Sequence, residues 1–318
     1  MRILVVHDWE PDPLQALTWK DGLAAAIREL SRRHVVNFIT FTREQPFTLP
    51  HEYFPINFIN PGEHAVQVAT SFEPDVVLHW ADTTREHAEP LSKLGIPMAL
   101  CFAGGATDNI TTQFFDHFFV ESLEYLDRFG AGGYSVSQAF GTNTDLFKPT
   151  GQPKLFDVGF PATYCNWKRH DLFTEATKGL RAWCAGFKYG DHEQWCYEVP
   201  EKAGVLTLPH VGPEALQTLY NASRCVFIPS LPSGGSQRTV LEAMACNVPV
   251  VIVERSKGAE YVLEGGGHVV DPDDVEGIRQ VLAEVVAGHG VDTRGYIMSK
   301  WSHLRYADEL EMGLKTLL

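Results

Sequence analysis

A short stretch in the last third of the chain combines glycines, hydroxyls, a cation and a carboxylate in a pattern suited to phosphate binding. It consists of Gly234, Gly235, Ser236, Gln237, Arg238 and Thr239, with Glu242 three residues later. Two adjacent glycines allow the backbone to approach a ligand closely, and a helix that begins just after them offers unpaired N–H groups to an anion. We therefore predict a phosphate-bearing ligand at this stretch.

Two apolar runs flank the stretch and indicate how it is positioned. Residues 225–228 precede the loop, and residues 248–253 follow a helix predicted over about 237–246. Short, wholly apolar strands around one helix are typical of a parallel sheet covered on both faces. Ligands of such sheets bind beyond the carboxyl ends of the strands, which is where 229–236 is expected to lie.

The same stretch resembles the donor-binding signature of the family 4 (group 1) glycosyltransferases, which are retaining enzymes of the GT-B fold. The resemblance covers Pro229-Ser230, the glycine-containing loop and residues 240–251. The family signature has two glutamates eight positions apart. Glu242 matches the second, which implies that it accepts hydrogen bonds from the donor ribose, whereas Gly234 stands in place of the first.

Glu242 also has an explanation that needs no ligand. The spacing from Thr239 to Glu242 is that of a capping box, in which a glutamate near the start of a helix bonds to the backbone. From the sequence, both interpretations stay open.

A second group of candidates lies near the start of the second half of the chain. The family has an Arg directly after the glycine that ends a strand, with a Lys a few residues later, and both contact the donor diphosphate. Here Phe160 follows Gly159, so the adjacent Lys168 and Arg169 are the candidates for these charges. They are predicted to open a helix over 168–185, where cations oppose the helix dipole. That unfavourable placement favours a role in binding.

In the first half of the chain the family often has a His after the strand predicted at 98–102. This chain has Ala103, Gly104 and Gly105 instead. The glycines still allow the backbone to approach a ligand closely, but the imidazole is absent. Further candidates at strand ends are Asp8, His79 and Ser137, each of which is also explained by local hydrogen bonding.

Composition excludes several classes of protein. The chain has 318 residues, 44% of them hydrophobic, and a formal net charge of −14, which argues against a general nucleic-acid or anionic-membrane surface. No run approaches the length of a membrane span, and the apolar run at the start is too short for a signal peptide. We expect a cytoplasmic protein, with peripheral membrane association left open. The six cysteines form no zinc pattern and are expected to be buried thiols, so no metal and no cofactor is predicted.

Alternating strand-like and helix-like segments predict two Rossmann-like domains, with parallel sheets facing a cleft. The predicted division is 1–149 for an acceptor-side domain, 150–300 for a nucleotide-sugar-binding domain, and 301–318 for a terminal helix that packs back on the first domain. Strands are predicted at 155–160, 205–208 and 225–228, and the carboxylates of 271–274 are predicted to cap a helix.

The resemblance implies metal-independent, retaining transfer of a sugar from a uridine or guanosine diphosphate donor. The acceptor stays open among a glycan, a lipid-linked glycan, a protein and a modified nucleic-acid base. In this family the departing phosphate is thought to deprotonate the acceptor, so a missing protein base does not exclude catalysis. The alternative is a nucleotide-sugar-binding GT-B protein without turnover, such as a partner subunit, which the absence of the first signature glutamate favours.

Overall fold

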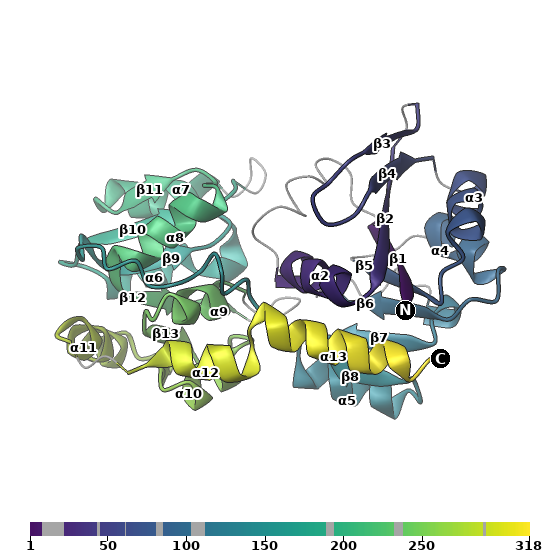
Figure 1. Ribbon diagram of the computed structural model, residues 1–318. Coiled ribbons are helices and arrows are strands. Elements are labelled where there is room, and N and C mark those ends of the chain that lie inside the picture. Colours follow the sequence, from purple (N-terminus) through teal and green to yellow (C-terminus); the bar gives the residue numbers. More distant parts are fainter. Residues whose placement is uncertain are drawn as a thin grey trace. The chain divides into compact units, whose positions relative to one another are not determined.

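The structure is a computed structural model that describes residues 1–7, 22–42, 45–60, 62–80, 85–102, 112–188, 194–231, 238–288 and 291–318. The chain forms two units. The first comprises Met1–Gly141 together with His303–Leu318, and the second comprises Thr142–Ser302. Each unit has its own sheet with helices packed against it (Figure 1). This confirms the predicted α/β class with two parallel-sheet units.

Within the described residues, the first unit contains an eight-stranded sheet of order β3-β4-β2-β1-β5-β6-β7-β8. Its pairs are parallel except for β3, which runs antiparallel to β4 at one edge. The strands are β1 (Arg2–His7), β2 (Val35–Phe41), β3 (Phe47–Leu49), β4 (Ile56–Ile59), β5 (Val76–Trp80), β6 (Met98–Cys101), β7 (His117–Val120) and β8 (Val136–Gln138).

Helices cover both faces of this sheet. They are α2 (Gly22–Arg33), α3 (Glu63–Phe72), α4 (Arg85–Ser92), α5 (Leu123–Ala131) and α13 (His303–Lys315), with a 3-10 turn η2 (Thr112–Phe114). Because side chains alternate along a strand, Ile3 and Val5 of β1 join the core under α2 and α13, whereas Leu4 and Val6 join the core under α3, α4 and α5. Two-sided burial accounts for the continuous apolar runs in the sequence.

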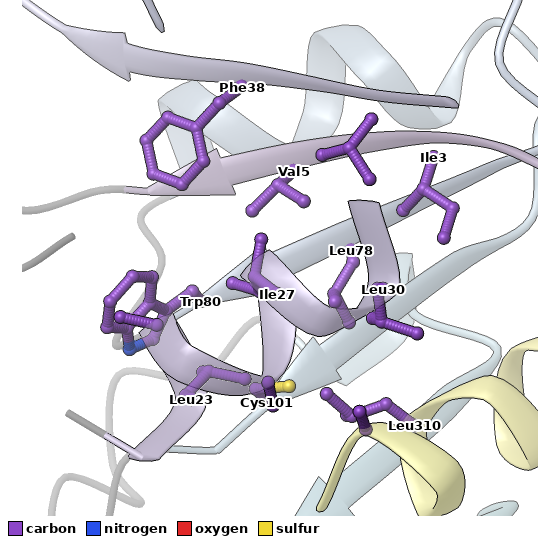
Figure 2. Close-up of a cluster of buried hydrophobic side chains, with 14 of the residues drawn as sticks. Ile3, Val5, Leu23, Ile27, Leu30, Phe38, Leu78, Trp80, Cys101 and Leu310 are labelled. Carbon is purple, nitrogen blue, oxygen red and sulfur yellow. The ribbon is translucent and has the colours of Figure 1, made fainter. Parts of the chain in front are cut away.

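Helix α13 belongs to the first unit, although the residue that precedes it in the chain, Ser302, belongs to the second. Its residue Leu310 lies in the same core as Leu23, Ile27 and Leu30 of α2 (Figure 2). Arg33 of α2 forms ion pairs with Asp308 and Glu311 of α13, at 2.7 and 3.0 Å. Apolar burial and charge pairing therefore both hold α13 on α2.

In the described part of the second unit, six strands form a parallel sheet of order β11-β10-β9-β12-β13-β14. They are β9 (Phe156–Pro161), β10 (Ala182–Ala185), β11 (Leu206–Leu208), β12 (Ser223–Ile228), β13 (Val250–Val253) and β14 (His268–Val270). The helices are α6 (His170–Ala176), α7 (Gln194–Lys202), α8 (Pro213–Asn221), α9 (Arg238–Ala245), α10 (Ala259–Glu264), α11 (Val275–Val286) and α12 (Thr293–Lys300), with a 3-10 turn η3 (Asn166–Lys168).

The helix predicted over 168–185 is wrong in its second half. Helix α6 ends at Ala176, and the chain turns through Gly179, whose φ of 84° is left-handed, into strand β10. All four residues of β10 are buried between β9 and β11, so packing decides its conformation. By contrast, the predicted cap is confirmed, because Asp274 accepts a hydrogen bond from the N–H of Gly277 at 2.9 Å at the start of α11.

The two units divide between Gly141 and Thr142, earlier than the predicted division after Pro149. Residues 142–150 belong to the second unit because its helices hold their backbone. Arg294 donates to the carbonyl oxygen of Phe147, and Asn221 donates to that of Lys148, each at 3.0 Å. We call residues 142–150 the joining segment.

We predict that the absence of a side chain at Gly313 allows α13 to pack closely against Phe119 and His117 of β7. A Cβ atom there would overlap the Phe119 ring and approach the His117 imidazole. Gly313→Ala should therefore destabilise the protein by about 1–3 kcal/mol, since overpacking forces neighbouring groups apart. The control is Gly130→Ala in α5, where the new methyl group would make only an ordinary contact with Val136. That variant should be neutral or slightly more stable because alanine favours a helix. Urea unfolding midpoints measure both effects, and equal midpoints for the two variants would contradict the prediction.

Candidate functional site

The parallel pairing of the second sheet brings three connecting segments to one edge. Strand β12 pairs with β9 on one side and with β13 on the other. The segments that follow these three strands therefore leave the sheet at the same end, which we call the carboxyl edge. The N–H of Leu231, after β12, donates to the carbonyl oxygen of Trp167 in η3 at 2.7 Å. This hydrogen bond brings the turn that carries Lys168 beside the start of the glycine-containing loop.

Several predicted residues of that loop lie outside the described residues, namely Gly234, Gly235, Ser236 and Gln237. The next two candidates, Arg238 and Thr239, are the first residues of α9 that the structure describes, and both are half-buried. An anion at the start of α9 would meet the N–H groups of its first turn and the Arg238 guanidinium.

Lys168 and Arg169 precede helix α6 rather than opening it. Lys168 ends η3 and is half-buried, and burial lowers the pKa of its ammonium group. Arg169 has a left-handed backbone, with φ of 55°, which is uncommon for a residue other than glycine. Its Nε lies 3.0 Å from Oδ1 of Asp171. Both residues lie on the segment that follows β9, and Asp171 competes for the charge of Arg169.

Glu242 is buried, with 1% of its surface exposed, in helix α9. The hydroxyl of Tyr220, in α8, donates to its Oε2 at 2.8 Å. The capping-box interpretation is wrong, because Thr239 lies inside α9 and an N-cap residue must precede the helix. The structure thus gives Glu242 a buried phenol as a partner, which the sequence did not predict.

Phe160, which replaces the arginine of the family, serves the core. It is fully buried, and its ring lies 5.1 Å from that of Phe173 and 4.9 Å from that of His170. Gly159 also has a packing role, because a Cβ atom there would collide with the indole of Trp183. Phe160 thus fills space between the sheet and α6, whereas Gly159 leaves room for the indole of Trp183 on β10.

Of the candidates in the first unit, the structure describes His79 and Ser137. Asp8, Ala103, Gly104 and Gly105 lie outside the described residues. His79, on β5, is fully buried and contacts Phe115 edge to face at 5.1 Å. Ser137, on β8, lies 2.9 Å from Nε2 of His117. Ser137 therefore has a local hydrogen-bond partner on the neighbouring strand β7.

Sequence reasoning missed an aromatic pair at the same edge of the second sheet. Phe187 follows β10 and His210 follows β11, and their rings stack at 3.7 Å with an interplanar angle of 10°. Both side chains are exposed, with 57% for Phe187. Lys188 lies over the Tyr197 ring beside them, at 3.8 Å. An exposed stack of this kind can hold a planar ring such as a nucleobase. The apolar residues of β10 could have indicated the strand that precedes Phe187, but they were predicted to be part of a helix.

The described residues contain no group of three or more His, Cys, Asp or Glu side chains that could hold a metal ion. All six cysteines are buried free thiols, as predicted. Among the helices that the structure describes, none is both long and apolar enough to cross a membrane.

Comparison with known proteins agrees with this architecture. Residues 155–287, which contain most of the second unit, match the family described as group 1 glycosyl transferases. No curated protein matches the chain.

Solved structures of similar fold match nearly the whole chain. A sucrose-phosphate synthase from Thermosynechococcus elongatus is 13% identical, with a TM-score of 0.75, over 99% of this chain and 98% of that one. A glycosyltransferase from Rickettsia africae ESF-5 is also 13% identical, with a TM-score of 0.76 over the same shares. Anabaena Alr3699/HepE, solved in complex with UDP, is 14% identical, with a TM-score of 0.74, over 99% of this chain and 100% of that one. The fold of the protein is therefore GT-B, as predicted.

His170, the first residue of α6, should make the second unit sensitive to acid. It is fully buried between the rings of Phe160 and Tyr164, and burial lowers its pKa to about 4. The unfolded chain binds this proton near its ordinary pKa of about 6.5, so stability is lost as pH falls from about 6.5 to about 4. His170→Phe removes this proton uptake. Between pH 7 and pH 5, the free energy of unfolding of wild type should therefore fall by about 2 kcal/mol more than that of the variant. Urea unfolding at both pH values measures this difference. If the free energy of unfolding of wild type and of the variant changes equally with pH, His170 is not a buried, neutral imidazole in the folded protein.

Proposed function

We propose that the protein is a retaining, metal-independent glycosyltransferase that takes a sugar from a uridine diphosphate donor. The observation that carries the proposal is the match of residues 155–287 to the group 1 glycosyl transferases, because this span includes every described candidate of the carboxyl edge. The choice of uridine follows Anabaena HepE, which was solved with UDP and with UDP-glucose.

The carboxyl edge offers a partner for each part of such a donor. The diphosphate lies at the start of α9, against its first N–H groups, Arg238 and Lys168. The ribose hydroxyls donate hydrogen bonds to Glu242. The base stacks on Phe187 and His210, whose exposed rings follow the next two strands of the sheet.

A second candidate function is nucleotide-sugar binding without turnover. It is favoured by Gly234 in place of the first signature glutamate, by the burial of Phe160 and by the ion pair of Arg169 with Asp171. Gly234 brings no carboxylate to the donor sugar, but Gly235 and Ser236 retain N–H groups, and Ser236 adds a hydroxyl. We therefore favour an active transferase whose sugar site is neutral and roomier than that of the family.

A panel of donors separates the two functions. Diphosphate sugars of uridine, guanosine, adenosine and thymidine are each incubated with the protein and a chelator of divalent metals, and binding and slow donor hydrolysis are recorded. We expect hydrolysis of a uridine diphosphate sugar under these conditions. Tight binding of a donor with neither hydrolysis nor transfer to a mixture of acceptors would support the binding function instead. No binding of any nucleotide would overturn both.

The role of Lys168 and Arg169 is tested by the phosphate dependence of binding. Wild type should bind UDP much more tightly than uridine, and Lys168→Ala with Arg169→Ala should reduce this preference about tenfold or more, because charge-assisted contacts are lost. Isothermal titration measures both ligands. The control removes the same charge from exposed helix ends, with Lys178→Ala and Lys202→Ala. If the first double variant keeps the preference of wild type, the start of α9 holds the diphosphate without these cations.

A further inference from the structure

The hydrogen bond between Tyr220 and Glu242 places a carboxylate in the interior of the second unit. Tyr220 is fully buried and Glu242 is 1% exposed, so the hydrogen bond between them is shielded from bulk water. A buried carboxylate is tolerated where hydrogen bonds replace its hydration, and the Tyr220 hydroxyl supplies one of these bonds. Removing that hydroxyl is therefore expected to change the orientation of Glu242.

The ring of Tyr220 contacts two other aromatic rings. It contacts Phe147 at 5.9 Å, with an interplanar angle of 68°, and Trp183 at 6.4 Å, with an angle of 60°. Trp183 is fixed in turn, because its Nε1 donates to Oγ of Ser223 at 2.8 Å. The phenol therefore has a defined place between strand β10 and the joining segment.

The joining segment is itself anchored around Phe147. The backbone carbonyl of Leu146 accepts a hydrogen bond from Gln217 at 2.6 Å, and that of Phe147 accepts one from Arg294 at 3.0 Å. Phe147 is fully buried. A chain of packed and hydrogen-bonded groups thus leads from the joining segment through Tyr220 to helix α9.

Tyr220 remains a hydrogen-bond donor over the whole working range of pH. Burial, and then the charge of Glu242, raise the pKa of its hydroxyl well above the ordinary value. The proton of this bond consequently stays on the phenol, and Oε2 of Glu242 stays an acceptor for it.

We infer that Tyr220 is a positioning residue for the donor: its hydroxyl fixes the carboxylate of Glu242 in the orientation that accepts hydrogen bonds from the ribose. The inference rests on the proposed function, in which Glu242 contacts the ribose, and it adds a residue that acts through Glu242 without touching the ligand. The contribution of the ribose hydroxyls to binding should therefore depend on a phenol 22 residues away in sequence.

A chemical and mutational cycle tests this inference. UDP and 2′,3′-dideoxy-UDP are titrated into wild type, Tyr220→Phe, Glu242→Gln and the double variant. Wild type should bind UDP about tenfold or more tightly than the dideoxy compound, as expected for hydrogen bonds to a charged group. Tyr220→Phe should largely abolish this ratio, and adding Glu242→Gln should change it no further, because the two residues act as one unit.

The control is another tyrosine–glutamate pair of the same unit. The hydroxyl of Tyr296 donates to Glu264 at 3.0 Å, and side-chain exposure of Glu264 is 55%. Tyr296→Phe removes the same atom and should leave the ratio of wild type unchanged. A general loss of stability does not reproduce the expected result, because it does not distinguish two nucleotides that differ only in their ribose hydroxyls.

The outcomes separate the inference from the proposed function. If wild type discriminates between the nucleotides and Tyr220→Phe discriminates equally, the inference is overturned while the proposed function stands. If wild type binds both nucleotides equally, the contact of Glu242 with ribose is wrong, and the inference fails with it. If wild type binds neither, the proposed donor is wrong, and the inference, which rests on it, is overturned as well.

Discussion

The central position of β12 organises the carboxyl edge of the second sheet. This strand is paired in parallel with β9 and with β13, so the segments after all three strands emerge at one edge. The hydrogen bond from Leu231 to Trp167 then joins two of these segments directly. Trp167, which precedes Lys168, is thereby held against Leu231, although some sixty residues separate them in the chain. The proposed site for a charged ligand lies at this edge.

Packing determines two neighbouring positions of β9. Phe160 fills the core beside Phe173, and Gly159 makes room for Trp183. In the proposed function, the positive charge for a diphosphate comes from the turn before α6 and from Arg238. Glu242 is the opposite case, because there a charged side chain lies in the interior. A carboxylate in an otherwise apolar interior is costly, and a buried phenol offsets that cost while fixing its orientation.

Much of the fold was predictable because its signals are local. The apolar runs of β12 and β13 and the cap of α11 at Asp274 depend on residues close in sequence. Strand β10 was missed because its four residues become a strand only through pairing with β9 and β11. The same limit applies to the site. The partner of Glu242 lies on another helix, and the stack of Phe187 on His210 forms only once β10 and β11 are side by side. Such contacts between distant residues leave no periodic signal in the sequence.

The most direct test of this account is a crystal structure of the protein with UDP. The account predicts the diphosphate at the first turn of α9, within hydrogen-bond distance of its N–H groups, and the ribose hydroxyls about 3 Å from the carboxylate of Glu242. The hydrogen bond of Glu242 with Tyr220 should persist in the complex. UDP bound away from the carboxyl edge of the second sheet, or bound there with its ribose turned away from Glu242, would contradict the account.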